Sequence, residues 1–158
     1  MQPHEIRPDT KLCTILGYNA QTGYMRKYFN KILKRQGINA TAIALNISDE
    51  HFHFTMSNVA QSKVDRMMVE QEFGEKATDY CNALNEAAQR TCRVDFVEIE
   101  EGKIMGYSLD DEVDTLFDTP QFLDDRIRLV AKMMLLAHRW YGAPIEIDEI
   151  PLFIKNGE

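Results

Sequence analysis

Apolar and polar residues alternate most regularly between Val94 and Asp111. Apolar residues recur on both sides of the dipeptide Gly102-Lys103, at Val94, Phe96 and the run 97–99 before it and at Ile104, Met105 and Tyr107 after it. This pattern is typical of two short strands joined by a tight turn. We therefore predict a β-hairpin, and the other elements are expected to pack around it.

The N-terminal third of the chain has the pattern of a strand, a helix and a second strand. Leu12–Gly17 is a short apolar run that ends at a glycine, as in a strand buried on both faces. The apolar residues that follow have helical spacing (Met25, Phe29, Ile32 and Leu33), and Gly37 is placed to end the helix. Residues 40–47 form the second predicted strand. A right-handed crossover with two parallel strands is expected.

Residues 48–56 fit two different structures. Ser48 could cap a helix that begins with Asp49 and Glu50, but the residues 51–56 (HFHFTM) also alternate as a strand would. Only the strand would place His51 and His53 on one face, where both could bind one metal ion. The helix gives no metal site, and both structures remain open here.

The remaining elements follow from the same periodicities. Residues 64–71 (VDRMMVEQ) are predicted to be a strand, residues 77–91 an amphipathic helix, and residues 121–141 a long helix after Pro120. The apolar residues of the last helix are Ile127, Val130, Ala131, Met133, Met134, Leu135, Leu136 and Ala137. They make more apolar surface than one side of a domain needs.

Size and composition limit the class of protein. A chain of 158 residues with 44% apolar residues is large enough for one core, so a single domain, 1–158, is expected. No apolar run approaches the roughly 18 to 20 residues of a membrane span, and the N-terminus lacks the layout of a signal peptide. We predict a cytoplasmic protein that does not bind membranes.

The net charge and the cysteines further limit the kinds of ligand and of cross-link that are expected. The net charge of −7 argues against nucleic-acid binding, although residues 26–35 carry five positive charges, which a solvated helix face explains. The three cysteines, Cys13, Cys81 and Cys92, have no metal-ligand spacing and lie in apolar stretches. They are expected to be reduced core residues.

Several of these stretches resemble the shikimate dehydrogenase family. In the hairpin, Val94, Gly102, Lys103, Gly106 and Asp110 match that family's motifs, and near the N-terminus the matches are Leu16, Gly17, Asn30, Leu33, Gly37 and Asn39. Trp140-Tyr141-Gly142 and Pro144 resemble the end of its C-terminal helix.

The resemblance implies an α/β fold: a three-layer, open, mostly parallel sheet of about five strands with a hairpin-like strand pair and a long terminal helix packed back on the domain. Residues 11–111 would correspond to the substrate domain and residues 121–144 to the returning helix. The family's dinucleotide-binding domain is not represented, because no G-x-G-x-x-G can be drawn through the glycines, and no cofactor is expected.

The resemblance also identifies candidate ligand-binding residues. Gly23 and Met25 stand where the family has two serines that hold the substrate carboxylate. Glu70 replaces its threonine, Gly74 its catalytic lysine, Asp95 its asparagine and Lys132 its glutamine, whereas Asp110 is retained. Three carboxylates would then face one ammonium, so we expect negligible binding of the anion shikimate.

Three functions are compatible with these changes. The first is a non-catalytic small-molecule-binding, regulatory or assembly protein, whose acidic cleft binds a cationic ligand or is closed by a Glu70–Lys132 ion pair. The second is an interaction protein in which the terminal helix contacts a second copy or a partner subunit. The alternative is an enzyme or enzyme subunit that uses Asp110 and Lys132 as an acid–base pair, with a cofactor supplied by another chain. No catalytic residue and no metal ligand is assigned.

Overall fold

The computed structural model describes residues 6–154, which divide into two compact units. Unit 1 contains the residues up to Lys11, Lys27–Thr41 and the residues from Leu109 onward. Unit 2 contains Leu12–Arg26 and Ala42–Ser108. The expected single domain stays a prediction.

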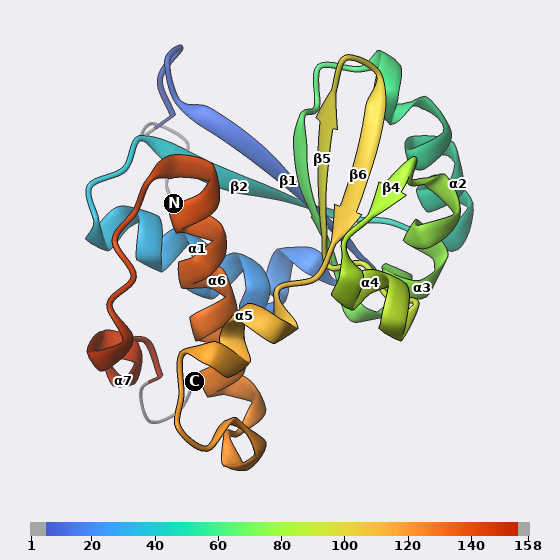
Figure 1. Cartoon of the computed structure of the whole chain (residues 1–158). Coiled ribbons are helices and arrows are strands. Elements are labelled where there is room, and N and C mark those ends of the chain that lie inside the picture. The colour runs from blue at the N-terminus through green and yellow to red at the C-terminus, as the bar shows by residue number, and fades with distance from the viewer. Residues whose placement is uncertain (1–5, 155–158) are drawn as a thin grey trace. The chain divides into compact units, whose positions relative to one another are not determined.

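The described residues form one open, mixed sheet of six strands in the order β2-β1-β3-β5-β6-β4 (Figure 1). The strands are β1 (Lys11–Gly17), β2 (Ala40–Asn46), β3 (Arg66–Val69), β4 (Ala83–Leu84), β5 (Phe96–Glu100) and β6 (Lys103–Tyr107). The pairs β1–β3 and β4–β6 are parallel, whereas β3–β5 and β5–β6 are antiparallel. The predicted α/β class with an open sheet is confirmed.

The predicted hairpin is confirmed as β5 and β6. Its register runs from Phe96 opposite Tyr107 to Glu100 opposite Lys103. The two-residue turn is therefore Glu101-Gly102, one residue earlier than the predicted Gly102-Lys103, because Lys103 is already paired in β6. Both turn residues have positive φ, 50° and 76°. Tight hairpin turns of this kind need positive φ at both positions, which explains the glycine.

The strand–helix–strand unit is also confirmed. Helix α1 (Tyr24–Arg35) connects β1 to β2, and Gly37 lies just beyond it with φ of 67°. The Lys11 amide donates to the Asn39 carbonyl at one end of the strand pair, and the Ile47 amide donates to the Gly17 carbonyl at the other. Because both contacts have nearly the same sequence offset, β1 and β2 run in the same direction.

Residues 49–58 form a helix, which decides between the two structures that the sequence allowed. Helix α2 (Asp49–Asn58) is capped by Ser48, whose side chain accepts a hydrogen bond from the His51 amide. His51 and His53 are two residues apart on this helix and point in different directions. The strand that would have let them share a metal ion is therefore wrong, and no cluster of metal-binding side chains occurs among residues 6–154.

The predicted continuous helix over residues 77–91 is wrong. The segment contains α3 (Gly74–Ala77), the short strand β4 and α4 (Glu86–Thr91). Asn82 interrupts the helix, because its amide donates to the Ile104 carbonyl and its Oδ1 accepts from the Ile104 amide. Asn85 then caps α4 by accepting from the Ala88 amide. Bonds to β6 thus replace those of one helical turn.

The long C-terminal helix starts later than predicted. Helix α6 (Asp125–Tyr141) begins after Asp124, whose side chain accepts from the Ile127 amide, and ends at Gly142. The side chains buried on it are Val130, Ala131, Met133, Met134, Leu136, Ala137 and Trp140. Unit 1 also contains α5 (Asp110–Thr115), α7 (Ile150–Phe153) and most of α1. Short 3₁₀ turns are η2 (Ala20–Thr22), η3 (Val59–Gln61), η4 (Gln71–Phe73), η5 (Thr78–Tyr80), η6 (Pro120–Phe122) and η7 (Ile147–Glu149).

Unit 2 has a core between one face of the sheet and the segments α2 to α4. Leu16, Met67 and Val97 from the sheet pack with Phe52 of α2 and Phe73 of η4. The rings of Phe52 and Phe73 are stacked, with centroids 4.2 Å apart. Such a pair is worth about 1 kcal/mol beyond its buried area. This core holds α2 and α3 beside the ends of β1 and β3.

Within unit 1, α1 packs against α6. The ring of Phe29 meets that of Trp140 edge to face at 6.1 Å, and the Arg35 guanidinium contacts the Glu149 carboxylate at 2.9 Å. No helix in the described part of the chain has the length and apolar composition to cross a membrane.

The cysteines only partly follow the prediction. All three are free thiols, and Cys13 is buried. Cys81 is half-buried, and burial raises the pKa of its thiol to about 11. The prediction is wrong for Cys92, which is exposed and lies at the C-terminal end of α4 in the left-handed conformation, with φ of 55°.

Candidate functional site

The predicted ligand-binding residues divide between the two units. Gly23, Met25, Glu70 and Asp95 belong to unit 2, whereas Asp110 and Lys132 belong to unit 1. In unit 2, the segment after β1 and the segment after β3 meet, because these strands are parallel neighbours. Open α/β sheets bind ligands at this edge, beyond the carboxyl ends of the strands.

The Glu70 side chain lies in a cradle made by two glycines. A Cβ atom added to Gly17 would lie 2.5 Å from Glu70 Cγ and 2.9 Å from its Cβ, and one added to Gly23 would lie 2.8 Å from Glu70 Oε1. Heavy atoms of this kind do not approach so closely, so glycine is needed at both positions to leave space for the carboxylate. The structure thus brings together two of the predicted residues, Gly23 and Glu70.

This carboxylate is enclosed but poorly satisfied. Glu70 Oε1 is buried, and among the described residues it has no hydrogen-bond partner. Burial, and then repulsion by the Glu72 carboxylate, raises the pKa of Glu70 to about 7. Glu72 lies at the same edge, because its Oε2 accepts from the Tyr18 amide at 2.7 Å. The site is therefore a pair of carboxylates of which one lacks a donor.

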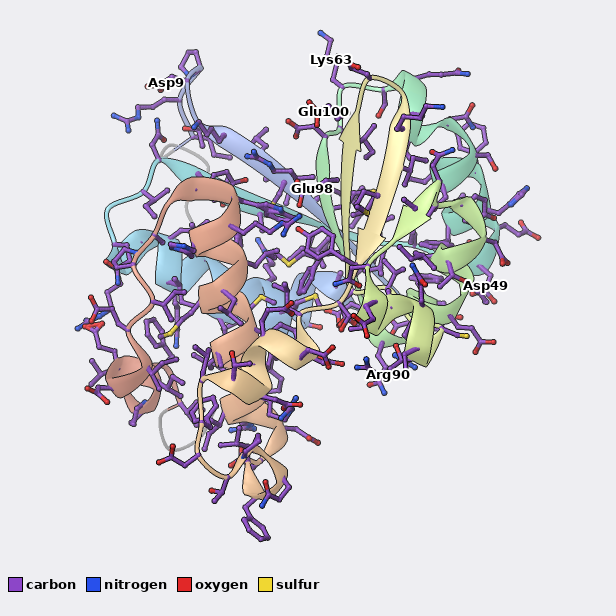
Figure 2. The ribbon with its side chains drawn as sticks, in the orientation of Figure 1. Asp9, Asp49, Lys63, Arg90, Glu98 and Glu100 are labelled. Carbon is purple, nitrogen blue, oxygen red and sulfur yellow. The ribbon has the colours of Figure 1, made fainter. Side chains whose placement is uncertain are left out.

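A second polar group lies beside the carboxylates. The Tyr18 hydroxyl donates to Asp49 Oδ1, and Lys76 Nζ contacts the same oxygen at 2.9 Å. The hydrogen bonds from Tyr18 and then Lys76 hold the pKa of Asp49 below its usual range, and the bond to Asp49 raises the pKa of Lys76. Figure 2 labels Asp49, at the start of α2. We define Tyr18, Asp49 and Lys76 as the polar triad.

The other predicted positions in unit 2 are less open. Met25 is 7% exposed, and the Asp95 backbone pairs with Val69 and Tyr107 in the sheet. At Gly74, a Cβ would lie 3.2 Å from Nη2 of Arg93, which donates to the Gln71 carbonyl. A guanidinium therefore occupies the space beside Gly74.

In unit 1, Asp110 and Lys132 form an ion pair. Lys132 Nζ lies 2.7 Å from Asp110 Oδ1, and Arg128 Nη1 lies 2.9 Å from Asp114 Oδ1. Each pair joins α5 to α6, and on both helices the two charges are four residues apart, or one turn. The two ion pairs thus cross-link the helices. Glu70 belongs to the other unit, so the predicted Glu70–Lys132 pair stays a prediction.

Comparison with known proteins identifies relatives. No family model matches the chain. A shikimate dehydrogenase (NADP(+)) from Methanococcus maripaludis is 27% identical over 105 residues, which is 66% of this chain and 38% of that protein. The chain is homologous to shikimate dehydrogenases over part of its length. The resemblance that the sequence predicted is confirmed.

Solved structures of shikimate dehydrogenases share the fold. The enzyme from Aquifex aeolicus aligns with a TM-score of 0.63 at 19% identity, covering 83% of this chain and 54% of that one. A shikimate dehydrogenase in complex with NADP+ has a TM-score of 0.63 at 18% identity, with coverages of 82% and 50%. The Listeria monocytogenes enzyme, solved with shikimate and NAD, has a TM-score of 0.62 at 15% identity, with coverages of 70% and 38%. The chain thus spans 38% to 54% of these relatives' lengths.

Sequence reasoning missed several residues of the edge in unit 2. Glu72 and Tyr18 were not singled out, Asp49 was considered only as a helix start, and Lys76 lies two residues beyond the position of the family's lysine. All four residues share one feature that the sequence could have shown: each lies in the segment that follows one of the strands β1, β2 and β3. This feature identifies a site only when the strand order is known, because the order β2-β1-β3 brings the three segments together.

Proposed function

We propose that this chain is a non-catalytic binding protein that takes a small cationic or amine ligand at the Glu70 carboxylate. The observation that supports this function is the buried Oε1 of Glu70, which lacks a donor among the described residues. Burying a carboxylate oxygen without a hydrogen-bond donor destabilises the folded chain. A ligand ammonium that donates a charge-assisted hydrogen bond to this oxygen would offset that destabilisation. The neighbouring Glu72 adds a second negative charge for the same ligand.

The same residues disfavour shikimate, the ligand of the solved Listeria relative. By the family resemblance, Gly23 replaces a serine that holds the substrate carboxylate. In this chain, Glu70 Oε1 lies 2.8 Å from the position that the serine Cβ would take. Glu70 therefore places its own negative charge where a substrate carboxylate would need a donor. Repulsion between the two carboxylates would prevent binding.

The alternative of an enzyme that uses Asp110 and Lys132 has one observation in its favour, their contact of 2.7 Å. The matching contact between Arg128 and Asp114 favours a structural role, because both pairs cross-link α5 and α6 in the same way. We therefore propose that Lys132 and Asp110 stabilise unit 1.

The binding function can be tested by calorimetry on the purified chain at pH 8, where Glu70 is mostly ionised. Alkylamines and polyamines should bind, whereas shikimate and quinate should not. Glu70→Gln should abolish amine binding, because the amide carries no charge. Glu75→Gln on the exposed side of α3 is the matched control and should retain it.

The pH dependence of binding gives a second readout. Since an ammonium ligand needs the ionised carboxylate, amine affinity should rise between pH 6 and pH 8 in the parent chain and in Glu75→Gln. Equal affinity of Glu70→Gln and the parent chain for every amine would rule out this site. Binding of shikimate by the parent chain would contradict the proposal as a whole.

A further inference from the structure

Three neighbouring strands each place one residue of the polar triad at the same edge of unit 2. Tyr18 directly follows β1, Asp49 follows β2 after Ser48, and Lys76 follows β3 on the short helix α3. Asp49 lies at the centre, with the Tyr18 hydroxyl and Lys76 Nζ on one of its carboxylate oxygens. This common position makes the triad part of the edge at which parallel strands bind ligands.

Tyr18 connects the triad to the two carboxylates. Its amide donates to Glu72 Oε2, and the preceding residue, Gly17, lies against Glu70. Its ring packs edge to face on Phe73, with centroids 5.0 Å apart, and its hydroxyl donates to Asp49. The tyrosine therefore connects Glu72, at its amide, to the oxygen of Asp49 that Lys76 also contacts, at its hydroxyl. The edge thus carries two carboxylates at one end and, at the other, the Lys76 ammonium paired with Asp49.

Lys76 has the exposure and the donors to bind an anion. About half of its side chain is exposed, 49%, and Asp49 takes one direction of an ammonium that carries three N–H donors. The aromatic ring of Phe73, 5.8 Å from Nζ, lies beside it. A ligand carboxylate could therefore join Lys76 without displacing Asp49.

We infer that the ligand is a zwitterion of the ω-amino acid class, with its ammonium at Glu70 and Glu72 and its carboxylate at Lys76. This inference rests on the proposed function, because it assigns the second end of the same ligand. The separation of the two ends selects a chain in which several methylene groups join the charges. In an α-amino acid the two charges are too close together to reach both ends of the site.

Three probes of equal chain length separate the contributions of the two ends. Calorimetry at pH 8 and low salt would compare ε-aminocaproate, hexylamine and hexanoate. We expect ε-aminocaproate to bind about tenfold more tightly than hexylamine, because its carboxylate adds one partly exposed charge-assisted contact; a tenfold difference corresponds to about 1.4 kcal/mol. Hexanoate and alanine should not bind measurably.

Lysine variants test the assignment of the carboxylate end. Lys76→Met should reduce the affinity for ε-aminocaproate to that for hexylamine and leave hexylamine binding unchanged, and Lys76→Arg should restore most of the difference. Lys63→Met is the matched control, because Lys63 is exposed and precedes β3, whereas Lys76 follows that strand; Figure 2 labels Lys63. Circular dichroism would verify that each variant is folded, and Lys76→Gln would replace Lys76→Met if the latter does not fold.

The possible results distinguish the inference from the function on which it rests. If the parent chain binds hexylamine and ε-aminocaproate equally, or if Lys76→Met keeps the tenfold difference, the inference is wrong and the amine site stands. If neither probe binds, both the inference and the proposed function fail. Loss of the difference in Lys76→Met alone among these methionine variants supports the inference.

Discussion

Replacing Glu70 by glutamine should change how the stability of the protein depends on pH. The carboxyl pKa is raised from 4.5 to about 7 in the folded chain, so the folded state binds a proton more tightly than the unfolded chain does. The resulting stability is fully present below pH 4.5 and is lost as the pH rises toward 7, because the buried carboxylate must then carry its charge. Glutamine has a similar shape and no charge, so this loss should be absent from the variant.

The size of the effect follows from the two pKa values. At about 1.4 kcal/mol per pH unit, the interval corresponds to about 3 kcal/mol. Part of the Glu70 side chain remains in contact with water, which lowers the expected value to about 1 to 2 kcal/mol. Relative to the parent chain, Glu70→Gln should therefore gain about 1 to 2 kcal/mol between pH 5 and pH 8.

Urea denaturation at pH 5, 6, 7 and 8 would measure this difference in the free energy of unfolding. Glu75→Gln is the control, because it removes one carboxylate from the exposed side of α3 and leaves Glu70 in place. If the difference between Glu70→Gln and the parent chain is constant from pH 5 to pH 8, the carboxylate is not buried as described. A gain that appears toward low pH instead would mean that a donor holds the ionised form.

Three further predictions concern the cradle and the helices. Gly23→Ala should lower the free energy of unfolding by about 1 kcal/mol, since the added Cβ would lie 2.8 Å from Glu70 Oε1. In the Glu70→Ala background the same substitution should cost much less, and additive effects in the double-mutant cycle would contradict the contact. Lys132→Met and Arg128→Met should each lower the free energy of unfolding, measured by urea denaturation, by up to about 1 kcal/mol, as expected of partly exposed ion pairs. A variant as stable as the parent chain would show that its ion pair does not stabilise unit 1. Leu135→Glu should leave the mass in solution unchanged, because the apolar side chains of α6 are mostly buried within the chain; a halved mass by light scattering would instead identify α6 as an interface.

Local patterns were sufficient for the elements whose bonds are local. The hairpin needed two residues with positive φ between alternating strands, and α1 needed a stripe of apolar residues and a glycine. For α2 the Ser48 cap was a local signal too, but the alternation of residues 51–56 left a strand equally open until the structure showed the helix. In each, the deciding groups lie within a few residues of one another. The resemblance to shikimate dehydrogenases likewise assigned Glu70 and Gly23 to one pocket, although it did not predict that the two residues touch.

Tertiary structure decided the features that depend on distant partners. The helix expected over residues 77–91 is interrupted because Asn82 bonds to Ile104, more than twenty residues away, and periodicity does not record such a partner. The lack of a donor at Glu70 and the connection of Tyr18 to Asp49 arise in the same way, from parallel strands that end side by side. The sequence by itself determined most of the strands and helices and the resemblance to shikimate dehydrogenases, since these follow from local periodicity and register. The pairing of β1, β2 and β3 determined which charges meet at the edge of unit 2, because electrostatic contacts depend on distance in space.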